Sequence, residues 1–168
     1  MDRLLERDVR LSSSLRVTEG NPLLRWSATA LAHSGDSWFW LAGLGVVWLA
    51  GSQSWKQWSL VMIAGVLITA VLVLLIKLSV RRRRPEGTWG GIYRKSDPHS
   101  FPSGHAARAV MLTVLAQSLG PPSFSIAMLI WAPLVGLARV ALGVHYFSDV
   151  IAGMALGIVM GLAVLQIF

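Results

Sequence analysis

Ionisable side chains recur near the ends of long apolar stretches, where burying them in a membrane is costly and marks them as functional candidates. Among them are His105 and, further along, His145 followed four residues later by Asp149. On a helix this spacing puts imidazole and carboxylate on one face. The carboxylate can then hold one ring nitrogen and leave the other as a nucleophile. His105 remains as a general acid for a departing alcohol.

Cationic residues accompany these histidines. Lys77, Arg84 and Arg139 supply donors that can neutralise a dianionic phosphate and the charge of its transition state. Pro102-Ser103-Gly104-His105 is a turn into a helix start, where free backbone N–H groups and the helix dipole favour an anion. Gly104 permits close approach of its backbone. These residue types together favour phosphoryl transfer.

Each motif also has a simpler explanation when taken alone. Arg81 to Arg84 form a basic cluster of the kind that flanks membrane spans. A Pro-Ser-Gly turn commonly caps a helix, and a His with Asp four residues later is often a structural hydrogen bond. The phosphoryl-transfer interpretation therefore depends on whether the motifs share one place in the fold.

The elements that must position them are membrane helices. Hydrophobic residues make up 54% of the 168 residues against 14% charged, and the mean hydropathy is +0.60. A spanning helix needs about 20 mostly apolar residues. Five stretches approach this length, so we expect an all-α polytopic membrane helix bundle in one domain over 1–168, with helices at 36–53, 57–79, 103–120, 123–143 and 146–168.

Sequential spans alternate in direction, and this brings the motifs together. The end of the second helix, the start of the third, the end of the fourth and the start of the fifth all emerge on one face. The long polar connection 80–102 lies on that face too. Gly153, Gly157 and Gly161 give the fifth helix a face for close packing, and His145 and Asp149 continue it.

Residues 1–35 are amphipathic in places, but charged residues interrupt every run that approaches a span. Arg25, His33 and Asp36 are the interrupting residues. An interfacial N-terminal helix is therefore expected there.

The spacings Lys77-x6-Arg84-Pro85, Pro102-Ser103-Gly104-His105 and Arg139-x5-His145-x3-Asp149 resemble the three-part signature of the type 2 phosphatidic acid phosphatase family. The resemblance implies a metal-independent lipid phosphate phosphatase that needs no cofactor. It implies His145 as nucleophile, oriented by Asp149, and His105 as general acid. It further implies phosphate ligands, namely Lys77, Arg84, Arg139, Ser103 and the Gly104 backbone. One departure is Ala138, where the family usually has Ser.

Three functions use such a site. The first is hydrolysis of a lipid phosphate monoester or diphosphate, of the phosphatidate, phosphatidylglycerophosphate or polyprenyl phosphate type, through a phosphohistidine. The second is transfer from the same phosphohistidine to another acceptor. The third is non-catalytic binding of a phospholipid, which would not need the histidines. The related vanadium haloperoxidases are soluble and larger, so the apolar spans argue against their chemistry.

The formal net charge of +7 invites a comparison with nucleic-acid-binding proteins. The basic residues lie between apolar spans, so we expect membrane lipids as partners and no nucleic acid. Of the 15 Lys and Arg residues, only Lys56 falls in a connection on the face opposite the site. This bias favours a cytoplasmic active face in a bacterial inner or cell membrane.

Overall fold

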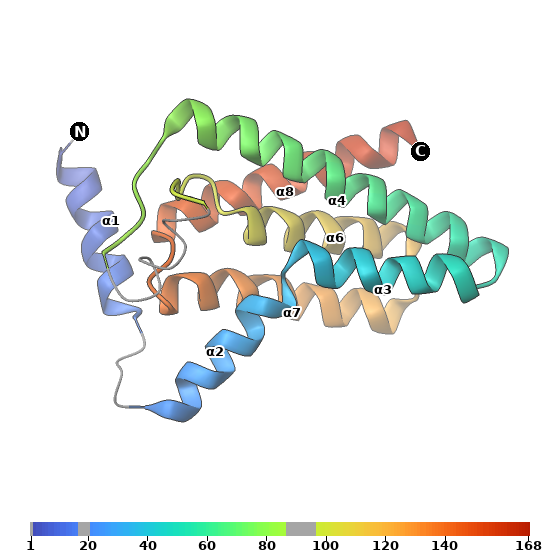
Figure 1. Cartoon of the computed structure of the whole chain (residues 1–168), viewed down its shortest axis with the longest axis horizontal. Coiled ribbons are helices and arrows are strands. Elements are labelled where there is room, and N and C mark those ends of the chain that lie inside the picture. The colour runs from blue at the N-terminus through green and yellow to red at the C-terminus, as the bar shows by residue number, and fades with distance from the viewer. Residues whose placement is uncertain (1, 17–20, 87–96) are drawn as a thin grey trace.

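The structure, a computed structural model, describes residues 2–16, 21–86 and 97–168. Within these ranges it is all-α, with one isolated antiparallel bridge between Arg83 and His99. The seven helices are α1 (Asp2–Ser14), α2 (Pro22–Ser34), α3 (Ser37–Ala50), α4 (Gln53–Val80), α6 (Gly104–Leu119), α7 (Pro122–Ala141) and α8 (Phe147–Ile167) (Figure 1). The predicted helical class is confirmed, and residues 87–96 of the predicted connection 80–102 lie outside the described residues.

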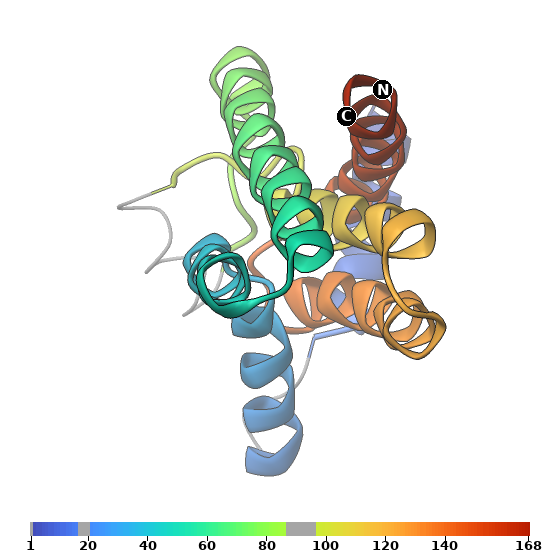
Figure 2. The ribbon, with the colours of Figure 1, turned by 90° about the vertical axis from the view of Figure 1, so that its right-hand side faces the viewer.

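Helix α6 is the centre of the bundle. Viewed along the bundle, it lies among α4, α7 and α8 (Figure 2). Small and medium-sized side chains around its circumference are buried, among them Ala106, Ala107, Met111, Leu112 and Leu115. Because protein surrounds α6, its first turn is fixed by several neighbouring helices at once.

Helices α6 and α8 approach closely through glycines. A Cβ atom on Gly157 would lie 2.4 Å from the carbonyl oxygen of Ala107, and one on Gly153 would lie 2.5 Å from that of Ser103. Gly161 faces Val114 in the same way, at 2.6 Å from its Cβ. The close-packing face that the glycine spacing predicts is confirmed.

The outer surface of the bundle is apolar, as a lipid environment requires. Leu67, Val71 and Leu75 of α4 and Val159 and Leu162 of α8 are each at least half exposed. In the part of the chain that the structure describes, three helices are long and apolar enough to cross a membrane: α4, α7 and α8.

The two remaining helices of the expected five are shorter. Helix α3 has 14 residues and α6 has 16. At about 1.5 Å per residue these reach ~21 and ~24 Å, less than the ~30 Å hydrocarbon core of a bilayer. Length and composition therefore identify three spans in the described residues, and the predicted count of five stays a prediction.

The N-terminal segment contains two helices where the sequence predicts one. The side chain of Asn21 accepts a hydrogen bond from the Leu24 N–H at 3.2 Å, and Pro22 opens the first turn, so a new helix starts there. Helix α1 is hydrogen-bonded to the start of α8, where Ser12 Oγ accepts from the Phe147 N–H at 2.9 Å. Helix α2 leaves the bundle axis and packs on α7 (Figures 1 and 2).

The close contact between α6 and α8 can be tested with a pair of glycine-to-alanine variants, one at the contact and one away from it. Gly157→Ala should lower the melting temperature in detergent by several degrees, because the new Cβ meets the Ala107 carbonyl. Gly45→Ala places its Cβ in open space and should leave the melting temperature unchanged or higher, since alanine favours helix by about 1 kcal/mol. Equal melting temperatures for the two variants would contradict the close contact.

Candidate active site

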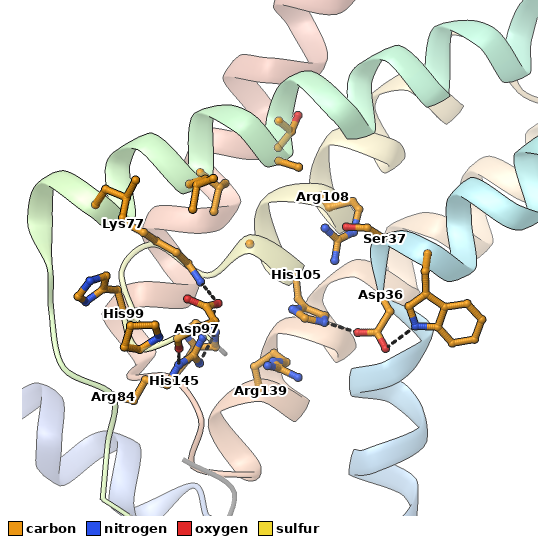
Figure 3. A pocket seen from close by; sticks show the side chains of 18 residues that line it. Asp36, Ser37, Lys77, Arg84, Asp97, His99, His105, Arg108, Arg139 and His145 are labelled. Atoms are coloured by element: carbon orange, nitrogen blue, oxygen red, sulfur yellow. Dashed lines mark hydrogen bonds and ion pairs between the residues drawn. The ribbon is translucent and has the colours of Figure 1, made fainter. Parts of the chain in front are cut away.

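The motifs converge at one end of the bundle. The end of α4, the start of α6, the end of α7 and the start of α8 lie together there, as the alternation of spans predicts (Figure 1). A cavity of about 720 Å³ opens among them. Its polar side chains come from segments far apart in the sequence and point toward one another (Figure 3).

Six of the eight predicted site residues line this cavity: Lys77, Arg84, Gly104, His105, Arg139 and His145. Ser103 and Asp149 lie behind the lining and are fully buried. The Ser103 N–H donates to the Asp149 carbonyl at 2.9 Å, and its Oγ accepts from the Ala106 N–H at 3.5 Å. Ser103 thus caps α6 and ties it to α8.

His145 lies in the turn between α7 and α8 with its side chain 1% exposed. His145 lines the cavity, and its Nε2 is 3.3 Å from Arg84 Nη1. Its Nδ1 lies 3.6 Å from Asp149 Oδ2. Burial, and then the positive charges of Arg139 and Arg84, hold the pKa of the imidazole well below its usual value. His145 is therefore neutral at neutral pH, as a nucleophile must be.

Arg84 and Lys77 are held close to this ring. The Arg84 guanidinium donates from Nη1 to the Val144 carbonyl at 2.8 Å and from Nε to the Asp97 carbonyl at 2.7 Å. The bridge between Arg83 and His99 folds the connection back on itself and brings Asp97 beside Arg84. Both Arg84 and Lys77 are almost fully buried, which strengthens their attraction for an anion.

Asp97 occupies the space between these two cations. Its carboxylate pairs with Lys77 and accepts from Arg84 Nη2 at 2.7 Å. Burial alone would raise the pKa of this carboxyl, but the hydrogen bond from Lys77 and the nearby positive charges lower it. The ionised Asp97 carboxylate is therefore ion-paired with Lys77 and Arg84, two of the predicted phosphate ligands. Asp97 is not among the residues predicted from the sequence, where only its place as an acid in a basic connection distinguishes it.

Arg82 contacts Asp149, the carboxylate of the third motif. Its Nη1 donates to Asp149 Oδ1 at 2.7 Å, and its Nη2 pairs with Asp8 of α1 at 2.7 Å. The guanidinium also lies over the Tyr146 ring, 4.1 Å from its centroid. Asp149 additionally accepts from the Tyr146 N–H at 2.9 Å. The sequence suggests only a basic membrane-flanking residue at this position, whereas the structure makes Arg82 a partner of Asp149.

His105 opens α6 on the opposite side of the cavity from Lys77 (Figure 3). Its Nε2 lies 2.7 Å from Asp36 Oδ1. Asp36, which also contacts His33, precedes α3 and lies outside the three-part motif. In the described part of the chain, no group of three or more His, Asp or Glu side chains is placed to hold a metal ion.

Comparison with known proteins agrees with this arrangement. The family model described as the PAP2 superfamily matches residues 58–168, about two thirds of the chain. The chain belongs to the PAP2 superfamily. Ala138, the departure from the family motif, is buried against Ala28 and Ala32 of α2, where an apolar side chain fits.

Named relatives of this PAP2 protein are phosphatases. It is 34% identical to decaprenylphosphoryl-5-phosphoribose phosphatase of Mycobacterium tuberculosis over 140 residues, covering 80% of this chain and 75% of that protein. It is 34% identical to lipid A 1-phosphatase of Rhizobium johnstonii over 99 residues, covering 55% of this chain and 40% of that protein. The predicted class, a PAP2-type phosphatase of membranes, is confirmed.

A solved structure shows the same fold. The PAP2-type phosphatidylglycerolphosphate phosphatase from Bacillus subtilis superposes with a TM-score of 0.80 at 25% identity. The match covers 99% of this chain and 87% of that one. The N-terminal helices are thus part of the shared architecture, although the family model begins only at residue 58.

Removing the carboxylate that occupies the cation pair tests the electrostatics of this PAP2 site. Asp97→Asn should tighten inhibition by inorganic phosphate, by about 3- to 10-fold, because the anion no longer competes with a charge of its own sign. Phosphate inhibition constants measured at neutral pH check this. Glu6→Gln, which removes an exposed carboxylate on α1, is the charge-matched control. Weaker phosphate inhibition in Asp97→Asn would show that Asp97 helps to build the anion site.

Proposed function

We propose that this protein hydrolyses a lipid phosphate through a phosphohistidine on His145. The observation that carries the proposal is a buried, neutral His145 that lines the cavity and has its Nε2 beside the guanidinium of Arg84. A neutral imidazole has the lone pair that attacks phosphorus. The adjoining cations supply the charge that the transition state requires.

The reaction has two balanced halves. In the first, His145 Nε2 forms a bond to phosphorus while the bond to the leaving oxygen breaks, and His105 gives that oxygen a proton. In the second, water loses a proton to His105 and bonds to phosphorus while the N–P bond breaks. Lys77, Arg84 and Arg139 hold the phosphoryl oxygens in both halves, so no step requires a metal or a cofactor. Phosphate then leaves with the enzyme unchanged.

The shape of the cavity supports a lipid substrate. One wall is polar, and the wall formed by α3 and α4 is apolar, with Trp38, Val73, Leu74 and Leu78 lining it. Leu74 and Leu78 are about half exposed on the outer surface of the bundle. An acyl or prenyl chain can therefore lie along this wall while its phosphate reaches the cations. The names of the relatives, which refer to decaprenyl, lipid A and phosphatidylglycerol phosphates, support the same substrate class.

The same phosphohistidine supports transfer to an acceptor other than water, which is the second candidate. The relatives named above are phosphatases, and this favours hydrolysis. Pure binding of a phospholipid requires only the cations. The placement of each histidine beside a carboxylate, His105 by Asp36 and His145 by Asp149, favours catalysis over binding.

We propose further that 1–168 is one membrane domain in which all five bundle helices cross the bilayer. The short α6 is enclosed by other helices, and the short α3 lies alongside α4 (Figures 1 and 2). Helices α1 and α2 are proposed to rest at the interface, since their exposed apolar residues, such as Leu5, Leu23 and Trp26, alternate with charged ones.

Removal of the nucleophile tests the proposed function. His145→Ala should lower phosphate release from lipid phosphates by about 10³-fold or more, because no other group can form the covalent intermediate. Asp149→Asn should also reduce it strongly, since it supports the wrong imidazole tautomer. Release is measured across phosphatidate, phosphatidylglycerophosphate and polyprenyl phosphates in detergent, with thermal melting as the control for folding. Turnover by His145→Ala within tenfold of wild type would refute the assignment.

The side of the membrane is tested by labelling. The charge distribution over the connections supports a cytoplasmic active face. The chain has no cysteine, so single cysteines at Ser96, in the connection 80–102, and at Gln166, near the opposite end of α8, report each face. In whole cells an impermeant maleimide should label Gln166→Cys but not Ser96→Cys. The reverse pattern would place the active face outside.

A further inference from the structure

A carboxylate from outside the family motif contacts the proposed general acid. Asp36 lies between α2 and α3, and its Oδ1 is 2.7 Å from His105 Nε2 (Figure 3). The family match begins at residue 58, so this contact joins the N-terminal segment to the catalytic motif. Both side chains are 17% exposed, so water screens the pair only weakly.

The backbone around Asp36 is anchored on three sides. Arg108, three residues after His105 on α6, donates from Nε to the Gly35 carbonyl at 2.9 Å. Trp131 of α7 donates from Nε1 to Ser34 Oγ at 2.8 Å, and Trp40 of α3 donates to the Ser34 carbonyl at 2.9 Å. These bonds fix the corner between α2 and α3 against α6 and α7.

Gly35 shows how closely this corner approaches the acid. A Cβ atom there would lie 3.2 Å from His105 Cδ2 and 2.9 Å from Val135 Cγ1. No larger residue fits without shifting its neighbours. The backbone beside Asp36 therefore packs directly on the His105 ring.

The second oxygen of Asp36 is also held. His33 Nδ1 lies 3.0 Å from Asp36 Oδ2, and Trp38 Nε1 donates to the same oxygen at 3.3 Å. Burial alone would raise the pKa of Asp36, but the hydrogen bonds from His105 and His33 lower it well below its usual value. Asp36 is thus a fixed negative charge at neutral pH.

The charges that face His105 come from three elements. Arg108 on its own helix and Arg139 at the end of α7 are positive and lie near the imidazole. Asp36, from the corner before α3, is the carboxylate hydrogen-bonded to the ring. It is therefore the counter-charge for the proton that His105 carries in the acid step.

We infer that Asp36 is a positioning residue for the acid–base step. It accepts the Nε2 proton of His105, fixes the ring and its tautomer, and leaves Nδ1 to exchange a proton with the reacting oxygen. In the first half-reaction the Nδ1 proton passes to the departing alkoxide as the O–P bond breaks. In the second, Nδ1 takes a proton from the attacking water. The inference rests on the proposed function, in which His105 is the acid.

The test is leaving-group dependence. Dioctanoyl phosphatidate releases a poor leaving group that needs a proton, whereas p-nitrophenyl phosphate releases one that does not. Asp36→Asn should lower kcat on the phosphatidate by about 10- to 100-fold and on the nitrophenyl ester by less than about threefold. Asp36→Glu, which restores the charge, should recover part of the loss. Glu6→Gln, on the exposed face of α1, is the control for loss of a carboxylate and should leave both rates unchanged.

His105→Ala and the double variant Asp36→Asn/His105→Ala are measured in parallel. The double variant should be no slower than His105→Ala on the phosphatidate, because Asp36 acts through His105. If His105→Ala shows the leaving-group dependence and Asp36→Asn does not, the inference fails while the proposed function stands. Equal losses on both substrates in His105→Ala, or no wild-type turnover of either ester, would overturn the acid role and the inference with it.

Discussion

The burial of positive charge at one end of an apolar bundle is the constraint on which the rest of the structure depends. Lys77, Arg84 and Arg139 are each no more than 6% exposed. A buried cation is stable only with a partner charge or full hydrogen bonding. Asp97 supplies that charge for Lys77 and Arg84 in this structure. In the proposed function, the substrate phosphate takes the place of the Asp97 carboxylate beside these two cations.

Close packing of α8 on α6 holds the helices together at the end of the bundle that carries the cavity. The glycines of α8 let it lie against the backbone of α6, and one of them, Gly153, faces the carbonyl of Ser103. In the same place the Ser103 N–H donates to the Asp149 carbonyl. The start of α8, which follows His145, and the start of α6, which carries His105, are thus joined backbone to backbone. The close packing of the α8 glycines on α6 therefore helps to fix the distance between the two histidines.

The apolar runs predicted the positions of the long helices, and the alternating direction of those helices predicted that the motifs meet at one end of the bundle. The expected spans 123–143 and 146–168 agree with α7 and α8 to within a few residues, because their boundaries carry Pro, Gly and charged residues. The contacts of Asp36, Asp97 and Arg82 were not predictable in this way. Each pairs with a residue at least 13 positions away, through a connection without helical periodicity. The division of the N-terminal segment at Asn21 depended on a single capping side chain, which the charge pattern around it obscured.

The central claim is a covalent bond between phosphorus and His145. It is tested most directly by acid or base quench of the wild-type enzyme during turnover of a ³²P-labelled lipid phosphate, followed by peptide mapping. We predict that base-quenched samples keep a label confined to the peptide containing His145, that acid treatment releases this label, and that His145→Ala retains none. Rapid hydrolysis with no label on the protein, or label on another residue, would contradict it.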